Sequence, residues 1–196
     1  MQDTFTAKAS GWDTPERTAL TKKFVDELLK NVPPQAEWKA LEIGAGTGLI
    51  GLQILPYVSK VVFEDTSESM LNVLKQKLIG DENVEILHGE VSDYKSTDIE
   101  LVFSSMAFHH IEDIEGTIQH LGRIVKLGGW VVVADLVTED GSFHGFDTIP
   151  HKGFDTEFLS QQFGNAGFGV KTVYVYNQIS KTIRYDQFIL IVQRLG

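Results

Sequence analysis

The segment with the clearest capacity for chemistry is a glycine-rich stretch, residues 41–51, which reads Leu-Glu-Ile-Gly-Ala-Gly-Thr-Gly-Leu-Ile-Gly. It follows a short apolar run, 40–43, that is typical of a buried strand, and it leads into an apolar helix predicted over 49–55. Glycines let the backbone turn tightly and let a ligand lie against it, and the free N–H groups that begin a helix point toward that ligand. We therefore expect the loop to bind a cofactor.

Two kinds of ligand are compatible with the glycine spacing. Gly46, Gly48 and Gly51 match the G-x-G-x-x-G pattern of dinucleotide-binding loops. The tight turn should begin where the strand ends, at Gly44, and the third position counted from there is a bulky leucine. The alternative pattern is E-x-G-x-G-x-G, which starts at Glu42. A carboxylate beside the loop favours a ligand with a cationic ammonium and sulfonium over a pyrophosphate, because like charges repel.

A second acidic position follows the next predicted strand, in the stretch 61–71, Val-Val-Phe-Glu-Asp-Thr-Ser-Glu-Ser-Met-Leu. An acidic residue about 20 positions past a glycine loop accepts both hydroxyls of a ribose in nucleotide-binding folds. Asp65 has this separation from Gly44, and the neighbouring Glu64 is the competing candidate. Both kinds of ligand contain a ribose, so this carboxylate does not separate them.

These two stretches resemble the first two motifs of class I, Rossmann-like S-adenosylmethionine-dependent methyltransferases, where Asp-x-Ser-x-x-Met-Leu is a common form of the second. The resemblance continues in order over residues 38–136, through Gly89-Glu90-Val91, the segment 101–113 and the Gly128-Gly129 pair. At the position of the family's adenine-binding Asp the sequence has Glu90, and Asp93 is the second candidate. The alternative is that Glu90 is a solvated loop carboxylate without a ligand. For Met70 the alternative is an ordinary core methionine. The resemblance implies S-adenosylmethionine as cofactor, held by Glu42, Gly44, Ala45, Gly46, Gly48, Asp65, Thr66, Met70, Glu90, Val91, Ser104 and Ser105.

Histidines and aromatic side chains follow the cofactor motifs. The resemblance places Phe108, His109 and His110 near the transferable methyl group, and two segments outside the motifs, 5–15 and 137–158, are expected on the acceptor side. A histidine could deprotonate an oxygen or nitrogen acceptor; a metal site and a purely apolar pocket are the alternatives. The expected catalytic residues are His109, His110 and His151; the expected substrate-binding residues are Trp12, Phe108, His144 and Phe146; the metal alternative uses His144, His151, Asp147 or Asp155.

Alternating short apolar runs and helical patterns must position these residues. Helices are predicted over 14–30, 67–78 and 112–126, the last ended by Gly128 and Gly129. The runs 170–176 and 185–192 leave no room for a helix between them and predict an antiparallel hairpin. The expected fold is α/β, a Rossmann-like, doubly wound, mostly parallel seven-stranded sheet with a C-terminal antiparallel hairpin and helices on both faces. One domain is expected, divided into 1–30 (N-terminal lid and helix), 38–136 (cofactor-binding core), 137–165 (substrate-side loop and helix) and 166–196 (hairpin).

The composition of the chain disfavours several classes of binding partner. The 196 residues carry a formal net charge of −10, which disfavours nucleic acid and an anionic membrane surface. The absence of cysteine excludes a disulfide scaffold, a zinc–thiolate site and a cysteine nucleophile. With no signal-peptide pattern and no apolar run near ~18–20 residues, a cytoplasmic location is expected. The oligomeric state stays open.

The sequence thus predicts an S-adenosylmethionine-dependent methyltransferase that acts on a small-molecule acceptor by in-line methyl transfer. The alternatives are a nicotinamide-dependent oxidoreductase and a non-catalytic S-adenosylmethionine-binding protein, because cofactor motifs report binding rather than turnover.

Overall fold

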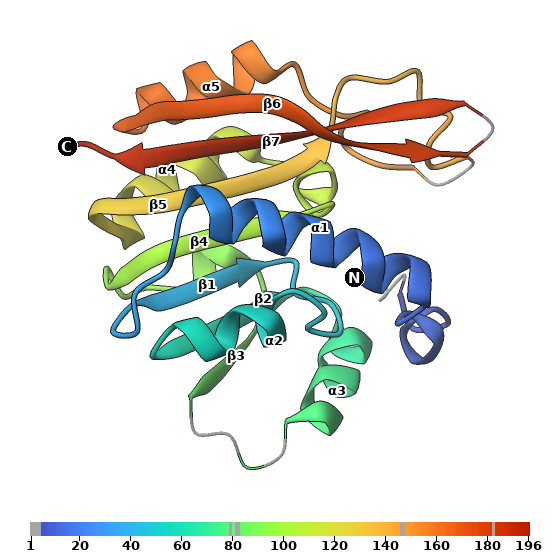
Figure 1. The fold of residues 1–196 in the computed structure, drawn as a ribbon, viewed down its shortest axis with the longest axis horizontal. Coiled ribbons are helices and arrows are strands. Elements are labelled where there is room, and N and C mark those ends of the chain that lie inside the picture. The colour runs from blue at the N-terminus through green and yellow to red at the C-terminus, as the bar shows by residue number, and fades with distance from the viewer. Residues whose placement is uncertain (1–4, 79, 81–82, 146–147, 182) are drawn as a thin grey trace.

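A seven-stranded mixed sheet forms the centre of the computed structural model, which describes residues 5–78, 80, 83–145, 148–181 and 183–196 (Figure 1). The strand order is β3-β2-β1-β4-β5-β7-β6. The first five strands in sequence run parallel, whereas β7 is antiparallel to β5 and β6 is antiparallel to β7. The predicted Rossmann-like sheet with its C-terminal hairpin is confirmed. The strands are β1 Lys39–Ile43, β2 Lys60–Asp65, β3 Val84–His88, β4 Ile99–Ser105, β5 Val125–Leu136, β6 Phe168–Ser180 and β7 Arg184–Arg194.

Helices cover both faces of the sheet and bury two apolar cores. On one face α1, α2 and α3 pack through residues such as Phe24, Ile54 and Leu71, and on the other α4 and α5 pack through residues such as Ile118 and Phe163. Central strands contact a core on each side, which explains why their sequences are apolar runs rather than alternating patterns. The helices are α1 Pro15–Asn31, α2 Gly51–Ile54, α3 Glu68–Lys77, α4 Ile114–Ile124 and α5 Thr156–Asn165.

Side-chain caps fix where the longer helices begin. The Thr14 hydroxyl accepts the Arg17 N–H at 3.2 Å before α1, and Ser67 accepts the Met70 N–H at 3.2 Å before α3. These caps satisfy backbone donors that have no partner inside the helix. The helices predicted over 14–30 and 67–78 are confirmed.

The third predicted helix ends earlier than expected. α4 stops at Ile124 and β5 begins at Val125, so Gly128 and Gly129 lie inside the strand and the prediction that they end the helix is wrong. A Cβ on Gly129 would lie 2.9 Å from the Lys126 carbonyl oxygen and 3.0 Å from the Glu100 carbonyl oxygen. The glycine pair therefore permits a close backbone approach at the irregular start of the β4–β5 pairing.

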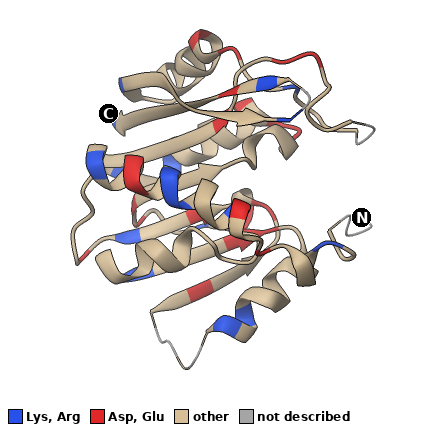
Figure 2. Ribbon diagram, turned by 45° about the vertical axis from the view of Figure 1, so that its right-hand side comes forward, with Lys and Arg blue, Asp and Glu red and all other residues tan. Residues whose placement is uncertain are grey.

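Charged residues of both signs lie along the surface elements. In α1, Lys22 pairs with Asp26 at 2.7 Å and Lys30 with Glu27 at 3.2 Å, and Figure 2 shows blue and red segments alternating along this helix. Within the described part of the chain, no helix combines the length and the apolar character that crossing a bilayer requires.

Candidate functional site

The glycine loop joins the carboxyl end of β1 to α2. Gly44, Gly46 and Gly48 have φ angles of 67°, 55° and 81°, a region that favours glycine. A Cβ on Gly44 would lie 2.3 Å from the Ala107 Cβ, and one on Gly48 would lie 2.4 Å from Leu74 Cδ1. A Cβ on Gly46 would meet nothing within 4 Å. Gly46 therefore faces the open side of the loop, where a ligand can lie against the backbone.

The two competing carboxylates at the end of β2 occupy different places. The Asp65 carboxylate is half-buried; its Oδ2 accepts the Gly46 N–H at 2.7 Å and its Oδ1 accepts the Ser67 N–H at 2.7 Å. Glu64 is buried beneath the loop, and its Oε2 accepts the Gly44 N–H at 3.2 Å. Asp65 is thus the carboxylate beside the open space above Gly46.

Glu42 also lies beneath the loop. Its side chain is only 2% exposed, and its Oε2 accepts the Gly51 N–H at 3.0 Å at the start of α2. The residue adjoins the glycine loop, as its place in the motif requires, but this contact is with the protein backbone. Any effect of Glu42 on a ligand would act through the shape and charge of the loop.

Negative charge accumulates around the loop and changes the proton affinity of its buried acids. Burial, reinforced by the carboxylates of Asp65, Glu90 and Asp93, raises the pKa of Glu64 to about 8. Burial likewise raises the pKa of Glu42 well above its ordinary value. Near neutral pH these two acids are therefore largely protonated, and the negative charge that favours a cationic ligand over an anionic one is that of Asp65, Glu90 and Asp93.

The expected adenine-side residues gather next to β2 and β3. Met70 in α3 is 2% exposed and Val91 is 5% exposed, so both are core residues with little free surface. Glu90 is exposed, and its N–H donates to Asp93 Oδ2 at 3.1 Å, which engages the runner-up carboxylate in a local turn. Of the remaining expected residues, Ala45 is buried and Thr66 is exposed.

The carboxyl end of β4 is strained. The Ser104 hydroxyl is fully buried and donates to the Ile43 carbonyl oxygen at 2.9 Å, which ties β4 to β1, while Ser105 is half-buried. Met106, the next residue, has a φ of 58°, a conformation that non-glycine residues rarely adopt. Strained backbone of this kind clusters at functional sites. Phe108, expected to contact the acceptor, is instead fully buried in the apolar core.

A buried histidine–carboxylate pair follows this strand end. His109 Nδ1 lies 2.7 Å from Asp135 Oδ1, and the His109 backbone N–H donates to Asp135 Oδ2 at 3.1 Å. The two side chains are 2% and 0% exposed. Asp135 is not among the residues predicted from the sequence, where its only signal is a charged residue at the end of a long apolar run.

Two further histidines pack against this pair. The ring centroid of His109 lies 4.2 Å from that of His110 and 4.6 Å from that of His144. Burial lowers the pKa of His110, to about 4, and the neighbouring His109 and His144 act in the same direction. Burial also lowers the pKa of His144. At neutral pH both rings are therefore uncharged.

The residues of the alternative metal site are separately engaged. The His151 Nε2 lies 2.9 Å from the Ile111 carbonyl oxygen, and Asp155 Oδ1 accepts the Glu157 N–H at 2.8 Å at the start of α5. Among the described residues there is no group of three or more histidines and acids that could hold a metal ion. Asp147 and Phe146 lie outside the described residues.

The N-terminal segment reaches both the glycine loop and the histidines. The Thr47 hydroxyl donates to Asp13 Oδ1 at 2.5 Å, and Lys77 Nζ lies 2.5 Å from Asp13 Oδ2. Phe5 packs edge-on against the His110 ring, with centroids 5.7 Å apart, and against Trp12 at the same distance. Phe5 therefore contacts both Trp12 and His110, and Trp12 belongs to the segment that covers the histidine.

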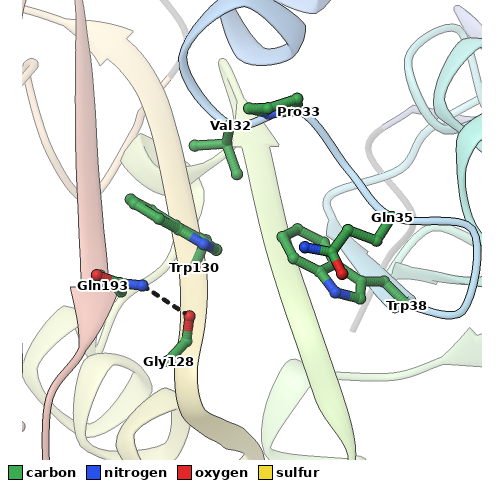
Figure 3. Close-up of a pocket in the computed structure, with 7 residues that line it drawn as sticks. All are labelled: Val32, Pro33, Gln35, Trp38, Gly128, Trp130 and Gln193. Atoms are coloured by element: carbon green, nitrogen blue, oxygen red, sulfur yellow. Dashed lines mark hydrogen bonds between the residues drawn. The ribbon is translucent and has the colours of Figure 1, made fainter.

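A separate hollow lies at the opposite end of the sheet. This cavity of about 360 Å³ adjoins the residue before β1, whereas the glycine loop follows β1 (Figure 3). None of its lining side chains can exchange a proton near neutral pH, so it offers no acid–base chemistry. It is lined by Val32, Pro33, Gln35, Trp38, Gly128, Trp130 and Gln193.

Comparison with known proteins identifies relatives of the sequence. Residues 41–133 match the model of a family described as a methyltransferase domain. An uncharacterized methyltransferase of Schizosaccharomyces pombe is 30% identical over 171 residues, which cover 77% of this chain and 60% of that protein. A demethylmenaquinone methyltransferase of Clavibacter sepedonicus is 30% identical over 109 residues, which cover 55% of this chain and 44% of that protein. The chain spans about half the length of these curated relatives.

Solved structures share the fold. A methyltransferase solved in complex with the Trm112 methyltransferase activator of Haloferax volcanii has a TM-score of 0.81 and 15% identity, with 100% of both chains covered. A SAM-dependent methyltransferase from Aquifex aeolicus has a TM-score of 0.75 and 20% identity, with 97% of this chain and 98% of that chain covered. At this level of identity the likeness concerns the arrangement of the strands and helices.

Proposed function

This chain belongs to the class I, Rossmann-like family of S-adenosylmethionine-dependent methyltransferases, and on that premise we propose that it transfers a methyl group to a small-molecule acceptor. The observation that carries the proposal is the open space above Gly46, bordered by the Asp65 carboxylate and surrounded by acidic groups. An adenosyl ligand with a ribose and a cationic sulfonium fits this combination of bare backbone, hydroxyl acceptor and negative charge.

The proposed binding roles follow the positions of the side chains. Asp65 accepts hydrogen bonds from the ribose hydroxyls, and Glu90 accepts a hydrogen bond from the adenine amino group. Asp93 is the second candidate for the adenine, because its Oδ2 already accepts the Glu90 N–H. Ser105 borders the methionine portion. The buried members of the expected set shape the loop and its flanks from beneath; they are Glu42, Ala45, Met70, Val91 and Ser104.

The proposed role of the protein is to position the acceptor and to exclude water. The sulfonium supplies an activated methyl group, so an acceptor held in line at ~3–3.5 Å needs little further activation unless it carries a tightly held proton. The N-terminal segment and the loop after β5 both reach the histidines at the end of β4, through Phe5 and His144. These contacts keep water from the acceptor.

The segments that cover the histidines favour a small acceptor. Both covering segments pack directly on the histidine cluster, so the reacting centre is enclosed by aromatic rings rather than by a broad charged surface. One curated relative carries the name of a demethylmenaquinone methyltransferase. A ring-containing small molecule is therefore the acceptor class to test first.

Turnover tests the proposal directly. The chain is incubated with labelled S-adenosylmethionine and a panel of phenols, quinols and amines, and labelled product is measured together with S-adenosylhomocysteine. We expect transfer to at least one class, and its loss in Asp65→Ala. Binding of the cofactor without transfer to any acceptor would support the non-catalytic alternative instead.

A further inference from the structure

The buried pair formed by His109 and Asp135 has a defined protonation pattern. Asp135 Oδ1 lies 2.7 Å from His109 Nδ1 and accepts the Leu136 N–H at 2.7 Å, and Oδ2 accepts the His109 N–H at 3.1 Å. An ionised carboxylate only accepts hydrogen bonds, so Nδ1 carries the proton and donates it. The lone pair of the neutral ring is therefore on Nε2, the atom that faces away from Asp135.

The pair lies beside the cofactor loop. His109 follows Ala107 by two residues, and the Ala107 Cβ occupies the place that a side chain on Gly44 would need, 2.3 Å from such a Cβ. The rings of His110 and His144 cover His109, and Phe5 covers His110. A base at Nε2 would thus act next to the cofactor and away from bulk water.

The described part of the chain has three buried side-chain atoms without a hydrogen-bond partner: Glu139 Oε1, His144 Nε2 and the Tyr176 hydroxyl. Of these side chains, His144 and Tyr176 lie near the pair. The charge of Asp135 acts on both side chains, and Tyr176 also neighbours Ser105 at the end of β4. A buried polar group without a partner is destabilising, and a polar ligand that pairs with it removes that cost. Burial raises the pKa of Tyr176, so its hydroxyl stays protonated and can donate.

The charges around His109 decide between acceptor classes. Asp135 faces His109 from β5, and His144 faces it from the loop after β5. His110 lies in the same turn as His109. The charges of Lys181 and Glu139 act on His144 in opposite directions. An ammonium only donates hydrogen bonds and adds a positive charge beside the sulfonium. A hydroxyl group arrives neutral, can donate to His109 Nε2 and can accept from Tyr176.

We propose that the acceptor is a phenol-type hydroxyl compound, that His109 Nε2 takes the hydroxyl proton, and that Asp135 is the positioning residue that keeps Nε2 free. This inference rests on the proposed methyltransferase function. As the acceptor O–H bond breaks, its proton passes to Nε2; the oxygen pair forms the O–CH3 bond while the S–CH3 bond breaks and its electron pair stays on sulfur. The resulting imidazolium is paired with the Asp135 carboxylate and later releases its proton to solvent.

The test compares two phenols at about pH 8 with saturating S-adenosylmethionine. An unsubstituted phenol, with a pKa of about 10, is protonated at this pH, whereas a nitro-substituted phenol is largely ionised. Wild type should methylate both. His109→Gln should lose transfer to the protonated phenol by about 100-fold or more, the typical contribution of a general base, and keep transfer to the ionised one. Asp135→Asn should show the same selective loss, because an amide can donate to Nδ1 and move the proton to Nε2.

His120→Gln is the matched control. His120 is a buried histidine in α4 whose Nε2 lies 2.9 Å from the Tyr94 carbonyl oxygen, outside the proposed site. This variant should treat the two phenols as wild type does. Equal losses on both phenols in His109→Gln, or transfer to amines with none to phenols, would overturn the inference.

Two additional readouts keep the outcomes distinct. S-adenosylhomocysteine binding by titration calorimetry reports the proposed function, so binding without transfer to any phenol refutes the hydroxyl assignment alone, and lack of binding refutes the methyltransferase proposal. If Asp135→Asn does not fold, nitrogen NMR of the wild-type imidazoles decides: a proton on His109 Nδ1 is expected, and one on Nε2 contradicts the role of Asp135.

Discussion

Gly46 and Gly44 adopt similar backbone conformations in the cofactor loop, yet their surroundings differ. Gly44 packs against Ala107, so its lack of a side chain serves the contact between two loops of the protein. Gly46 faces open space, so its lack of a side chain serves whatever enters that space. The same residue type thus serves packing at one position and proposed ligand binding at the other.

Gly46→Ala should therefore weaken ligand binding more than it weakens folding. At a φ of 55° an alanine is less stable than glycine by about 1–2 kcal/mol, and its methyl group would occupy the proposed ligand space. We expect at least a roughly tenfold loss of S-adenosylhomocysteine affinity, which corresponds to about 1.4 kcal/mol. Gly80→Ala is the matched control, because Gly80 has a φ of 59° and open surroundings outside the loop. Thermal unfolding and titration calorimetry separate the two effects, and unchanged affinity in Gly46→Ala would contradict the placement of the ligand.

Glu64 should make stability depend on pH. Its pKa is raised from 4.5 in the unfolded chain to about 8 in the folded protein. The stabilisation that this provides is present at low pH and is lost as pH rises toward 8, because the unfolded state releases the proton first. Glu64→Gln should flatten the decline of the unfolding temperature between about pH 5 and 8. The exposed Glu68→Gln is the control, and parallel curves for wild type and Glu64→Gln would show that Glu64 is already ionised in this range.

At the residue scale the sequence predicted the turn of the glycine loop but not the pairing of His109 with Asp135. Gly44, Gly46 and Asp65 form a local pattern that can be read from spacing alone. Asp135 lies 26 positions from His109, and their pairing depends on β5 lying beside β4. Tyr176 reaches the same region from β6, a strand of the hairpin. No local pattern records contacts of this kind.

At the scale of elements, capping residues determine helix starts more reliably than glycines determine helix ends. Thr14 and Ser67 cap the helices that follow them, and the predicted ranges 14–30 and 67–78 start at these two residues. Gly128 and Gly129 belong to a strand, because backbone pairing with β4 begins before the glycines are reached. Glycine pairs serve close approach between strands as well as helix termination, and sequence alone does not distinguish the two.

Asp155 offers a test at this scale. Its Oδ1 accepts N–H groups of Glu157 at 2.8 Å and Phe158 at 3.2 Å, so Asp155→Ala should cost about 1 kcal/mol of stability, or roughly 2–4 °C in unfolding temperature. Asp155→Asn keeps an acceptor and should change little. A chelator should leave the unfolding temperature of wild type unchanged; a drop with chelator that Asp155→Ala abolishes would support a metal role instead.

At the scale of the whole molecule, segments distant in sequence meet around the carboxyl ends of β1, β4 and β5. Asp13 joins the N-terminal segment to Thr47 in the glycine loop and to Lys77 in α3. The His151 N–H donates to the His109 carbonyl oxygen at 3.2 Å and anchors the loop after β5. The cofactor loop, the histidines and both covering segments are therefore connected by direct contacts.

Asp13→Ala should loosen the N-terminal cover. The ion pair with Lys77 is partly exposed and contributes about 1 kcal/mol or less, but the segment would lose both its anchor on Thr47 in the cofactor loop and its anchor on Lys77 in α3. We expect S-adenosylhomocysteine to dissociate several-fold faster in stopped-flow measurements. Lys22→Ala, which breaks the exposed Lys22–Asp26 pair in α1, is the control. Equal dissociation rates in wild type and Asp13→Ala would mean that the segment does not retain the ligand.

Binding of an adenosyl sulfonium cofactor by the glycine loop and Asp65 can be measured by titration calorimetry with S-adenosylhomocysteine, with NADH as the parallel ligand. We expect S-adenosylhomocysteine to bind, NADH not to bind, and Asp65→Ala to lose at least roughly tenfold in affinity, because charge-assisted hydrogen bonds to the ribose are removed. Binding of NADH in place of S-adenosylhomocysteine, or of neither ligand by folded protein, would contradict this expectation.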